Sequence, residues 1–125
     1  MGPMDARILV TSTPLPPDEL ARLVSLGFGD MVKFVVDVER GVIAIGGELH
    51  SDAEALLLEE GSRQTDLWGG NYYPGRGPEG CLEYTSLINI RPAQENPSME
   101  VEKAPLRERI RSIVFELVGR GEAPS

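Results

Sequence analysis

The chain has 125 residues, 41% hydrophobic and 26% charged, which is the composition of a single globular domain. Its 20 acidic and 12 basic residues give a net charge of −8, which disfavours nucleic-acid binding because that requires clustered lysine and arginine. No apolar run approaches the roughly 20 residues of a membrane span, and no secretory signal is visible. One cysteine excludes an internal disulfide and one histidine excludes a multi-histidine zinc site. We therefore expect a cytoplasmic protein.

The chain begins with the pattern of a strand followed by a helix. Residues 6–11 are apolar and predict a short strand. Pro17 suits the first position of a helix, and the two acidic residues after it suit the positive end of the helix dipole. Gly27 is expected to end this helix in a left-handed conformation. Residues 1–5 are expected to be disordered or a cloning remnant.

The next segment predicts a β-hairpin. Apolar side chains alternate with other side chains over residues 31–39, and an apolar segment returns over residues 42–46. A two-residue turn between these segments would place Val36 opposite Ile45 on an apolar face. The acidic side chains of the first segment would then lie on the opposite face.

The second half of the chain predicts a capped helix, two strands and a final helix. A Ser-x-x-Glu capping box at residues 51–54 starts the first of these helices. Residues 66–73 and 82–91 are expected to pair as strands, joined by the glycine- and proline-rich loop 74–80. The last helix starts near Pro105. It carries an apolar stripe at helical spacing, formed by Leu106, Ile110, Ile113, Val114 and Leu117.

Together these elements predict an α+β fold. We expect a mainly antiparallel sheet of about four to five strands with three helices packed on it. One domain is expected over residues 6–119, followed by a frayed tail over residues 120–125. The pattern does not determine the order of the strands in the sheet.

The stretch GGELHSD is the strongest candidate for a functional site, because it joins a strand to a helix and contains the only histidine. Gly46 and Gly47 allow an unusual backbone path or the close approach of a partner. Glu48, His50 and Asp52 could perform acid–base chemistry or hold a divalent metal ion. The alternative is architectural: capping and the helix dipole explain the acidic side chains, and the histidine is then a hydrogen-bonding residue.

Two further segments carry candidate ligand-binding side chains. Trp68 and Asn71 lie on the first strand of the second pair, where ordinary core packing is the alternative explanation for the tryptophan. Asn89 and Arg91 lie on the next strand. Arg91 could bind a carboxylate or a phosphate, or it could form an ion pair on a solvated face.

Two other motifs are expected to be structural. The sequence GRGPEG at residues 75–80 matches the spacing of a dinucleotide-binding loop, but the strand before it is not followed by the required helix, so we expect a hairpin loop. Cys81 has no histidine near it in sequence and is expected to be a packed side chain rather than a nucleophile. No motif indicates a cofactor.

The blocks GGELHSDAE, DLWGGN and SLINIRP resemble those of a family of short prokaryotic proteins whose domain has no assigned function. The resemblance covers about residues 28–118 of the chain. It implies no reaction, cofactor or substrate. It adds only that the blocks contain a set of polar, glycine and aromatic residues, which are Gly47, Glu48, His50, Asp52, Trp68, Asn71, Asn89 and Arg91.

Two functions remain open at this point. The first is a small non-catalytic binding or assembly protein that forms a homodimer, because the exposed edges of a small sheet need covering. The second is a small hydrolase-like enzyme that uses His50 with Glu48 or Asp52, with or without a divalent metal ion. Neither a membrane nor a nucleic acid is an expected partner.

Overall fold

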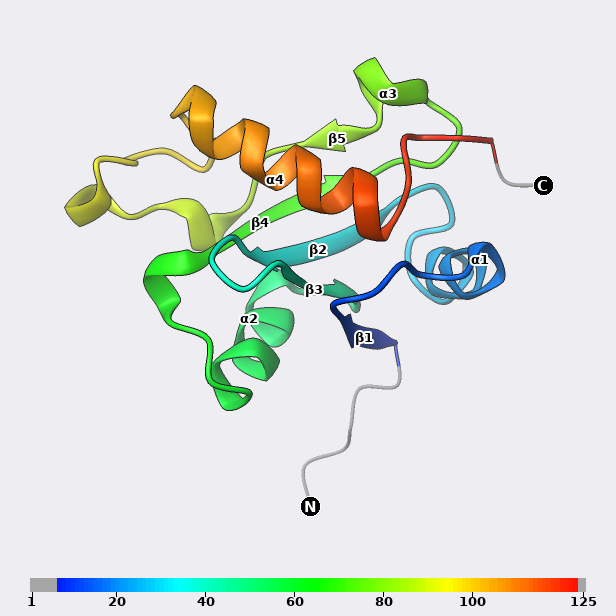
Figure 1. The fold of residues 1–125 in the computed structure, drawn as a ribbon, viewed down its shortest axis with the longest axis horizontal. Coiled ribbons are helices and arrows are strands. Elements are labelled where there is room, and N and C mark those ends of the chain that lie inside the picture. Colours follow the sequence, from blue (N-terminus) through cyan, green and yellow to red (C-terminus); the bar gives the residue numbers. More distant parts are fainter. Residues whose placement is uncertain (1–6, 124–125) are drawn as a thin grey trace.

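The computed structural model describes residues 7–123, which form an antiparallel five-stranded sheet with helices on both faces (Figure 1). The strands are β1 (Ile8–Thr11), β2 (Val32–Asp37), β3 (Val42–Gly46), β4 (Leu67–Tyr72) and β5 (Leu82–Glu83). Their order across the sheet is β1-β3-β2-β4-β5, so β1 and β5 are the edge strands. The predicted α+β class and mainly antiparallel sheet are confirmed.

The helices are α1 (Pro17–Leu26), α2 (His50–Glu59), the single turn α3 (Gly77–Gly80) and α4 (Ala104–Leu117). Short 3₁₀ turns occur at Gln64–Asp66, Leu87–Asn89 and Pro92–Gln94. Helices α1 and α4 cover one face of the sheet and α2 covers the other (Figure 1). Across the described part of the chain, no helix has the length and apolar character needed to span a membrane.

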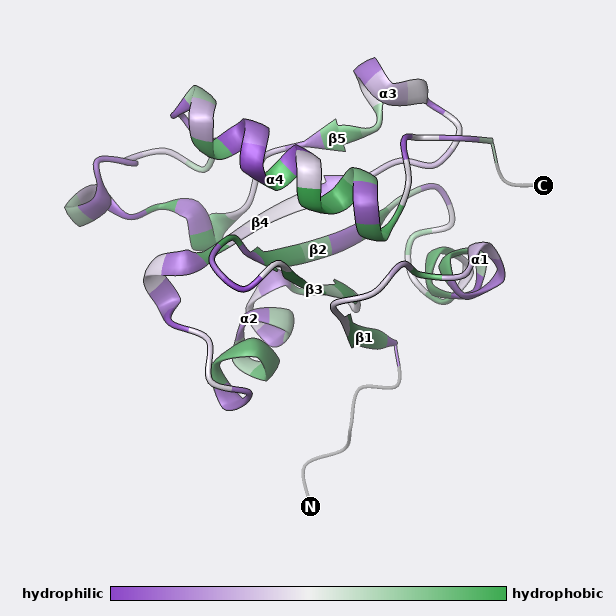
Figure 2. Ribbon diagram, in the orientation of Figure 1, coloured by the Kyte–Doolittle hydropathy of each residue, from purple (hydrophilic) through white to green (hydrophobic). Residues whose placement is uncertain are grey.

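The hydrophobic core has two layers because both faces of the central strands are covered. Phe34 and Val36 of β2 pack in the layer below α4, whereas Val35 packs with Ala53 and Leu57 of α2. Strands buried on both faces are apolar at nearly every position, and Figure 2 shows β2 and β3 as largely hydrophobic. The alternation in the sequence therefore separates two buried faces rather than a buried face from a solvated one.

The β2–β3 hairpin forms, but its predicted register is wrong by two residues. Val36 lies opposite Ile43 rather than Ile45. The loop spans residues 38–41 because the buried carboxylate of Asp37 accepts two backbone N–H groups of this loop at 2.9 Å each. A shift of two residues leaves every side chain on its original face, so the faces were predicted correctly although the pairing was not.

The predicted strand over residues 82–91 is also wrong beyond Glu83. Only β5 pairs with β4, and the chain then continues through bends and 3₁₀ turns. The side-chain amide of Asn89 pairs with Gly69 like a backbone group, with N···O distances of 2.9 and 3.0 Å. The guanidinium of Arg91 donates to the carbonyl of Leu67. Two side chains therefore bind the backbone groups at the edge of β4 that a neighbouring strand was expected to bind.

Two helix ends differ from the predictions. Helix α2 begins at His50 with Leu49 as its N-cap, and no side chain caps it, so the capping box at Ser51 does not form. Gly27 follows α1 with φ −99°, outside the left-handed region. The positive φ falls instead at Gly29, whose N–H donates to the carbonyl of Val24 at 3.0 Å.

The final helix matches its prediction closely. It begins at Ala104, one residue before Pro105. Its apolar stripe lies on the sheet, with Ile110, Ile113, Val114 and Leu117 buried and Leu106 partly buried.

The segment after α4 contacts the rest of the fold through Gly121. Gly121 is buried, and its N–H donates to the hydroxyl of Tyr72 at 2.8 Å. Its carbonyl accepts the N–H of Gly75, in the loop before α3, and the N–H of Gly77, the first residue of α3. Residues 1–6, which include the predicted disordered start, and residues 124–125 lie outside the described residues.

Candidate functional site

His50 is the first residue of α2, and its ring lies on the glycine pair of β4. Its Nε2 lies 2.8 Å from the carbonyl oxygen of Gly70. Because a carbonyl only accepts, Nε2 carries the proton and donates it. A Cβ on Gly69 would lie 3.2 Å from the His50 ring and 2.8 Å from Cβ of Ser86. Gly69 therefore leaves room for the His50 ring, and Gly70 supplies the carbonyl that the ring binds.

The surroundings of His50 favour its neutral form. Burial is the largest cause that lowers its pKa below the usual value, and the hydrogen bond to Gly70 opposes this effect. The positive charge of Lys33 lowers the pKa further, and the side chain of Asn71 raises it. A neutral imidazole held by one ring nitrogen is a fixed contact between α2 and β4.

Asn71 is the one predicted ligand-binding residue that lies beside His50. Its Nδ2 donates to Oε1 of Glu83 at 3.0 Å, and Tyr73 donates its hydroxyl to the same oxygen at 2.8 Å. This hydrogen bond raises the pKa of Tyr73. The Oδ1 atom of Asn71 is buried and has no protein partner among the described residues. The cluster is polar, but its best donors are already used within the protein.

Among the contacts of residues 7–123, neither Glu48 nor Asp52 forms a hydrogen bond or an ion pair with His50. The Glu48 carboxylate is 3.5 Å from the guanidinium of Arg7 and largely exposed. Asp52 is exposed in the first turn of α2. Over residues 7–123, no three histidine, cysteine, aspartate or glutamate side chains are grouped so that they could hold a metal ion.

The backbone conformation at positions 46 and 47 favours glycine. Both are buried and have positive φ values, 111° and 82°. A Cβ on Gly46 would overlap the carbonyl of Arg7, because β1 runs directly beside this position. The close approach that the glycines permit is therefore that of another strand of the same sheet.

Trp68 and Arg91 come together in a stack. The guanidinium lies 3.9 Å from the centre of the indole ring. Arg91 also donates to the carbonyls of Gln64 and Leu67 and, at 3.2 Å, to Oε1 of Gln94. Burial lowers the pKa of Arg91, and the nearby negative charge of Glu54 raises it. The Arg91 guanidinium, which was predicted to bind a carboxylate or a phosphate, thus donates to backbone carbonyls instead.

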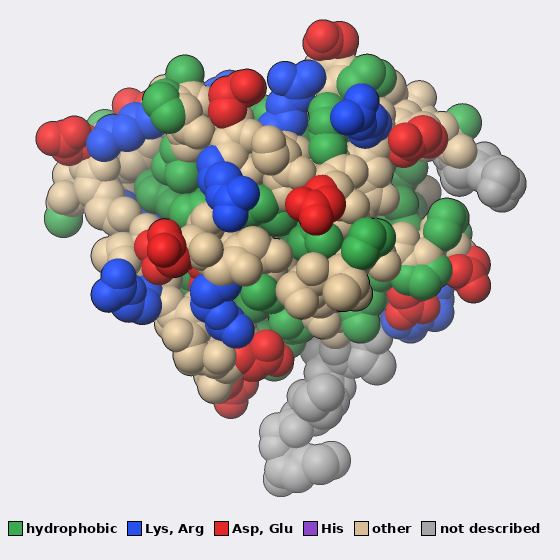
Figure 3. All heavy atoms as spheres, viewed as in Figure 1, with side chains coloured by type: hydrophobic (Ala, Val, Ile, Leu, Met, Phe, Trp, Pro, Cys, Tyr) green, Lys and Arg blue, Asp and Glu red, His purple; other side chains and the backbone are tan. Residues whose placement is uncertain are grey.

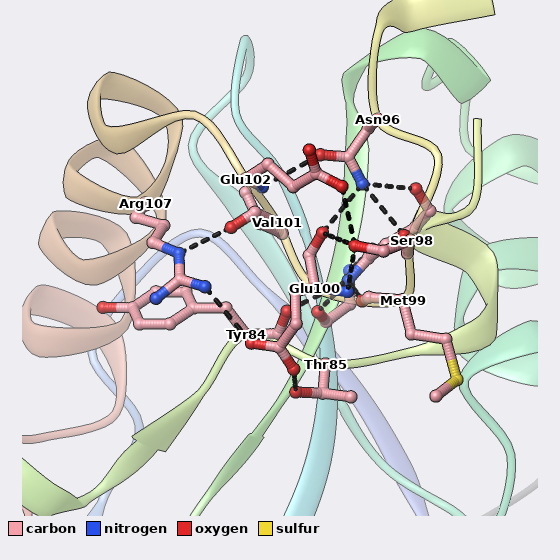
Figure 4. A network of polar contacts seen from close by, with 11 residues as sticks. Tyr84, Thr85, Asn96, Ser98, Met99, Glu100, Val101, Glu102 and Arg107 are labelled. Atoms are coloured by element: carbon pink, nitrogen blue, oxygen red, sulfur yellow. Dashed lines mark hydrogen bonds and ion pairs between the residues drawn. The ribbon is translucent and has the colours of Figure 1, made fainter. Parts of the chain in front are cut away.

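A second asparagine, Asn96, also binds backbone groups through its side-chain amide. The sequence analysis did not identify this residue. Its Nδ2 donates to the carbonyls of Asn89, Ser98 and Glu100 at 2.8, 3.1 and 2.9 Å, and its Oδ1 accepts the N–H of Glu102 at 2.9 Å (Figure 4). These bonds fold the polar segment before α4 onto the sheet. A polar segment gives no periodic signal, so only the asparagines themselves could have indicated it.

The comparisons with known proteins identify the family of the chain. The family model of a protein of unknown function, DUF5674, matches residues 9–117, which is most of the chain. A search of curated proteins and a search of solved structures each found no match. The chain therefore belongs to the DUF5674 family.

Proposed function

We propose that this protein acts by binding and assembly rather than by catalysis, and that it forms a homodimer. The observation that carries this proposal is the outer edge of β1. Within the described residues β1 is paired on one side only, with β3. An unpaired edge offers backbone N–H and C=O groups to another strand.

The side chains of β1 support pairing with a second copy. Ile8, Leu9 and Val10 are each only partly buried although the strand is apolar. Helix α2 packs mainly on β2 and β3, and Figure 2 shows β1 as a hydrophobic strand at the margin of the fold. A two-fold axis at this edge would extend the sheet and cover the same side chains on both copies.

The environment of His50 supports a non-catalytic role. Its Nε2 donates to a backbone carbonyl of β4, which makes the histidine a contact between α2 and the sheet. The enzyme alternative depends on the carboxylates of Glu48 and Asp52, but Glu48 pairs with Arg7 and Asp52 is exposed. The unpaired Cys81 is buried, which supports the proposal of a cytoplasmic location.

Sedimentation velocity over a protein concentration series tests the dimer. The wild type is expected to sediment increasingly as a dimer as concentration rises. Val10→Lys places a charge on the edge strand and is expected to shift the population to monomer. Ser12→Lys, which adds the same charge at an exposed residue just after β1, is the matched control. A monomeric wild type, or a Val10→Lys dimer as stable as the wild-type dimer, contradicts the proposal.

A further inference from the structure

A pocket of about 610 Å³ lies between the first turns of α4, the end of β2 and the polar segment before α4. Its apolar lining consists of Val38, Trp68, Pro105 and Leu106, and its charged lining consists of Lys103 and Arg109. This volume is within the range of small-molecule sites, roughly 300–1,000 Å³. Figure 3 shows the face of the molecule that carries α4, where hydrophobic side chains are exposed among basic and acidic ones.

The charge of the pocket is opposite to the charge of the protein. The chain has a net charge of −8, yet both charged residues that line the pocket are basic. Helix α4 also directs its positive end here and has no acidic residue in its first turn. The charged side chains that line the pocket are therefore positive on a protein whose net charge is negative.

Arg109 is held in place and has donors to spare. Its Nε donates to the carbonyl of Val38 at 2.9 Å, which fixes the guanidinium at the rim. Among residues 7–123 no carboxylate forms an ion pair with it. Its terminal N–H groups therefore remain available for an oxygen ligand, in the planar geometry that suits a carboxylate.

Lys103 is paired, but its pair is easily exchanged. Its Nζ lies 3.2 Å from Oε1 of Glu95, and the two side chains are 53% and 82% exposed. Exposed ion pairs contribute little because water and salt screen them. A carboxylate bound in the pocket can replace Glu95 at small cost.

The floor of the pocket is pre-formed. Trp68 is only 3% exposed, and the guanidinium of Arg91 stacks on its ring. Asn96, which also lines the pocket, is fixed by four hydrogen bonds to the backbone. A rigid apolar floor reduces the ordering cost of binding.

We propose that this pocket binds a small amphipathic carboxylate. Its apolar body would contact Val38, Trp68 and Leu106, and its carboxylate would bind Arg109 and Lys103. The inference is separate from the proposed homodimer, because no residue of β1 lines the pocket. A monomeric protein could therefore still bind the ligand, and a dimeric one could fail to do so.

Trp68 makes the proposal directly measurable, since it is the only tryptophan in the chain. Titration with octanoate is expected to change its fluorescence in a saturable manner. Octan-1-ol has the apolar body without the charge, acetate has the charge without the body, and octylammonium has the opposite charge. Each should bind at least about fivefold more weakly than octanoate, the factor that corresponds to one modest charged interaction.

Two variants test the basic rim. Arg109→Gln and Lys103→Gln are each expected to weaken octanoate binding about fivefold or more. Arg22→Gln removes the same charge from α1, outside the pocket lining, and should bind as the wild type does. Because Lys103 is half exposed, its variant is expected to fold even if the Arg109 variant does not. No saturable response to octanoate, equal binding of octan-1-ol, or wild-type affinity in Lys103→Gln overturns the proposal.

Discussion

At the scale of single residues, His50 shows how a side chain that stands out in the sequence can have its main contact on a distant strand. Its uniqueness and its place before a helix drew attention to it. Its role depends on Gly69 and Gly70, which lie about twenty residues further on and accept the ring on β4. No local pattern relates a histidine to the backbone of a distant strand. The sequence therefore singled out His50 but could not indicate the group that it binds.

Replacing His50 should therefore cost stability. His50→Ala is expected to lower the free energy of unfolding by about 1–2 kcal/mol, because a half-buried hydrogen bond and its packing are lost. Ser51→Ala is the neighbouring control. Since Ser51 is exposed and does not cap α2, its effect should stay within about 0.5 kcal/mol. Urea denaturation measures both, and equal effects of the two substitutions would refute the structural role of His50.

The same histidine should make stability depend on pH. Its pKa is lowered in the folded state, so below its ordinary value of 6.5 the unfolded chain takes up a proton that the folded chain does not. The stability advantage of the wild type over His50→Ala is therefore complete above about pH 6.5 and decreases as the pH falls. Unfolding curves of both proteins from about pH 8 to about pH 5 test this. A constant difference across this interval contradicts the lowered pKa.

Asn89 should be the most sensitive of the predicted polar residues. It is buried, and Asn89→Ala would leave the N–H and C=O of Gly69 and the carbonyl of Met99 without its amide. We expect a loss of about 2–4 kcal/mol. Asn71→Ala, which removes an amide bonded to the exposed Glu83, should lose about 1 kcal/mol or less. Thermal melting compares the two, and the reverse order would be inconsistent with the edge pairing by Asn89.

At the scale of elements, α4 is the helix that the sequence described best. A stripe at helical spacing over one face is a signal that tertiary context rarely overrides. Ile110→Ala is expected to cost about 2–5 kcal/mol because the side chain is fully buried between α4 and the sheet. Ser112→Ala, on the exposed face of the same helix, should change stability by less than about 0.5 kcal/mol. An unchanged melting temperature for Ile110→Ala would mean that α4 is not docked.

The elements that the sequence described poorly share one physical cause. In the hairpin, the Asp37 carboxylate binds loop N–H groups and lengthens the turn. After β5, the side chains of Asn89 and Arg91 bond to β4 where backbone pairing was expected. Polar side chains that replace backbone partners leave the hydrophobic pattern unchanged. Periodicity consequently predicts the faces of the hairpin correctly, but it fails after β5, where Asn89 is buried and Ile90 is exposed.

At the scale of the whole molecule, the two sides of the sheet differ in whether their edge groups have hydrogen-bond partners. The β4 edge beyond β5 is closed by Asn89 and Arg91, whereas the outer side of β1 has no partner strand within residues 7–123 (Figure 1). The pocket beside Trp68 likewise depends on the complete fold, because its lining joins Val38 to residues 94–109. Sequence motifs identified Asn89 and Arg91, but neither their role at this edge nor the surfaces that the fold leaves open.

Hydrogen–deuterium exchange at low and high protein concentration tests the proposed β1 interface most directly. If a second copy pairs with this strand, exchange in the peptide containing residues 8–11 slows as concentration rises, because more of its N–H groups become hydrogen-bonded. The peptide containing β2, an interior strand of the sheet, is the internal control and should exchange at the same rate throughout. The dimer proposal predicts this selective protection of β1. Exchange of β1 that is independent of concentration, up to the highest at which the protein is soluble, would contradict it.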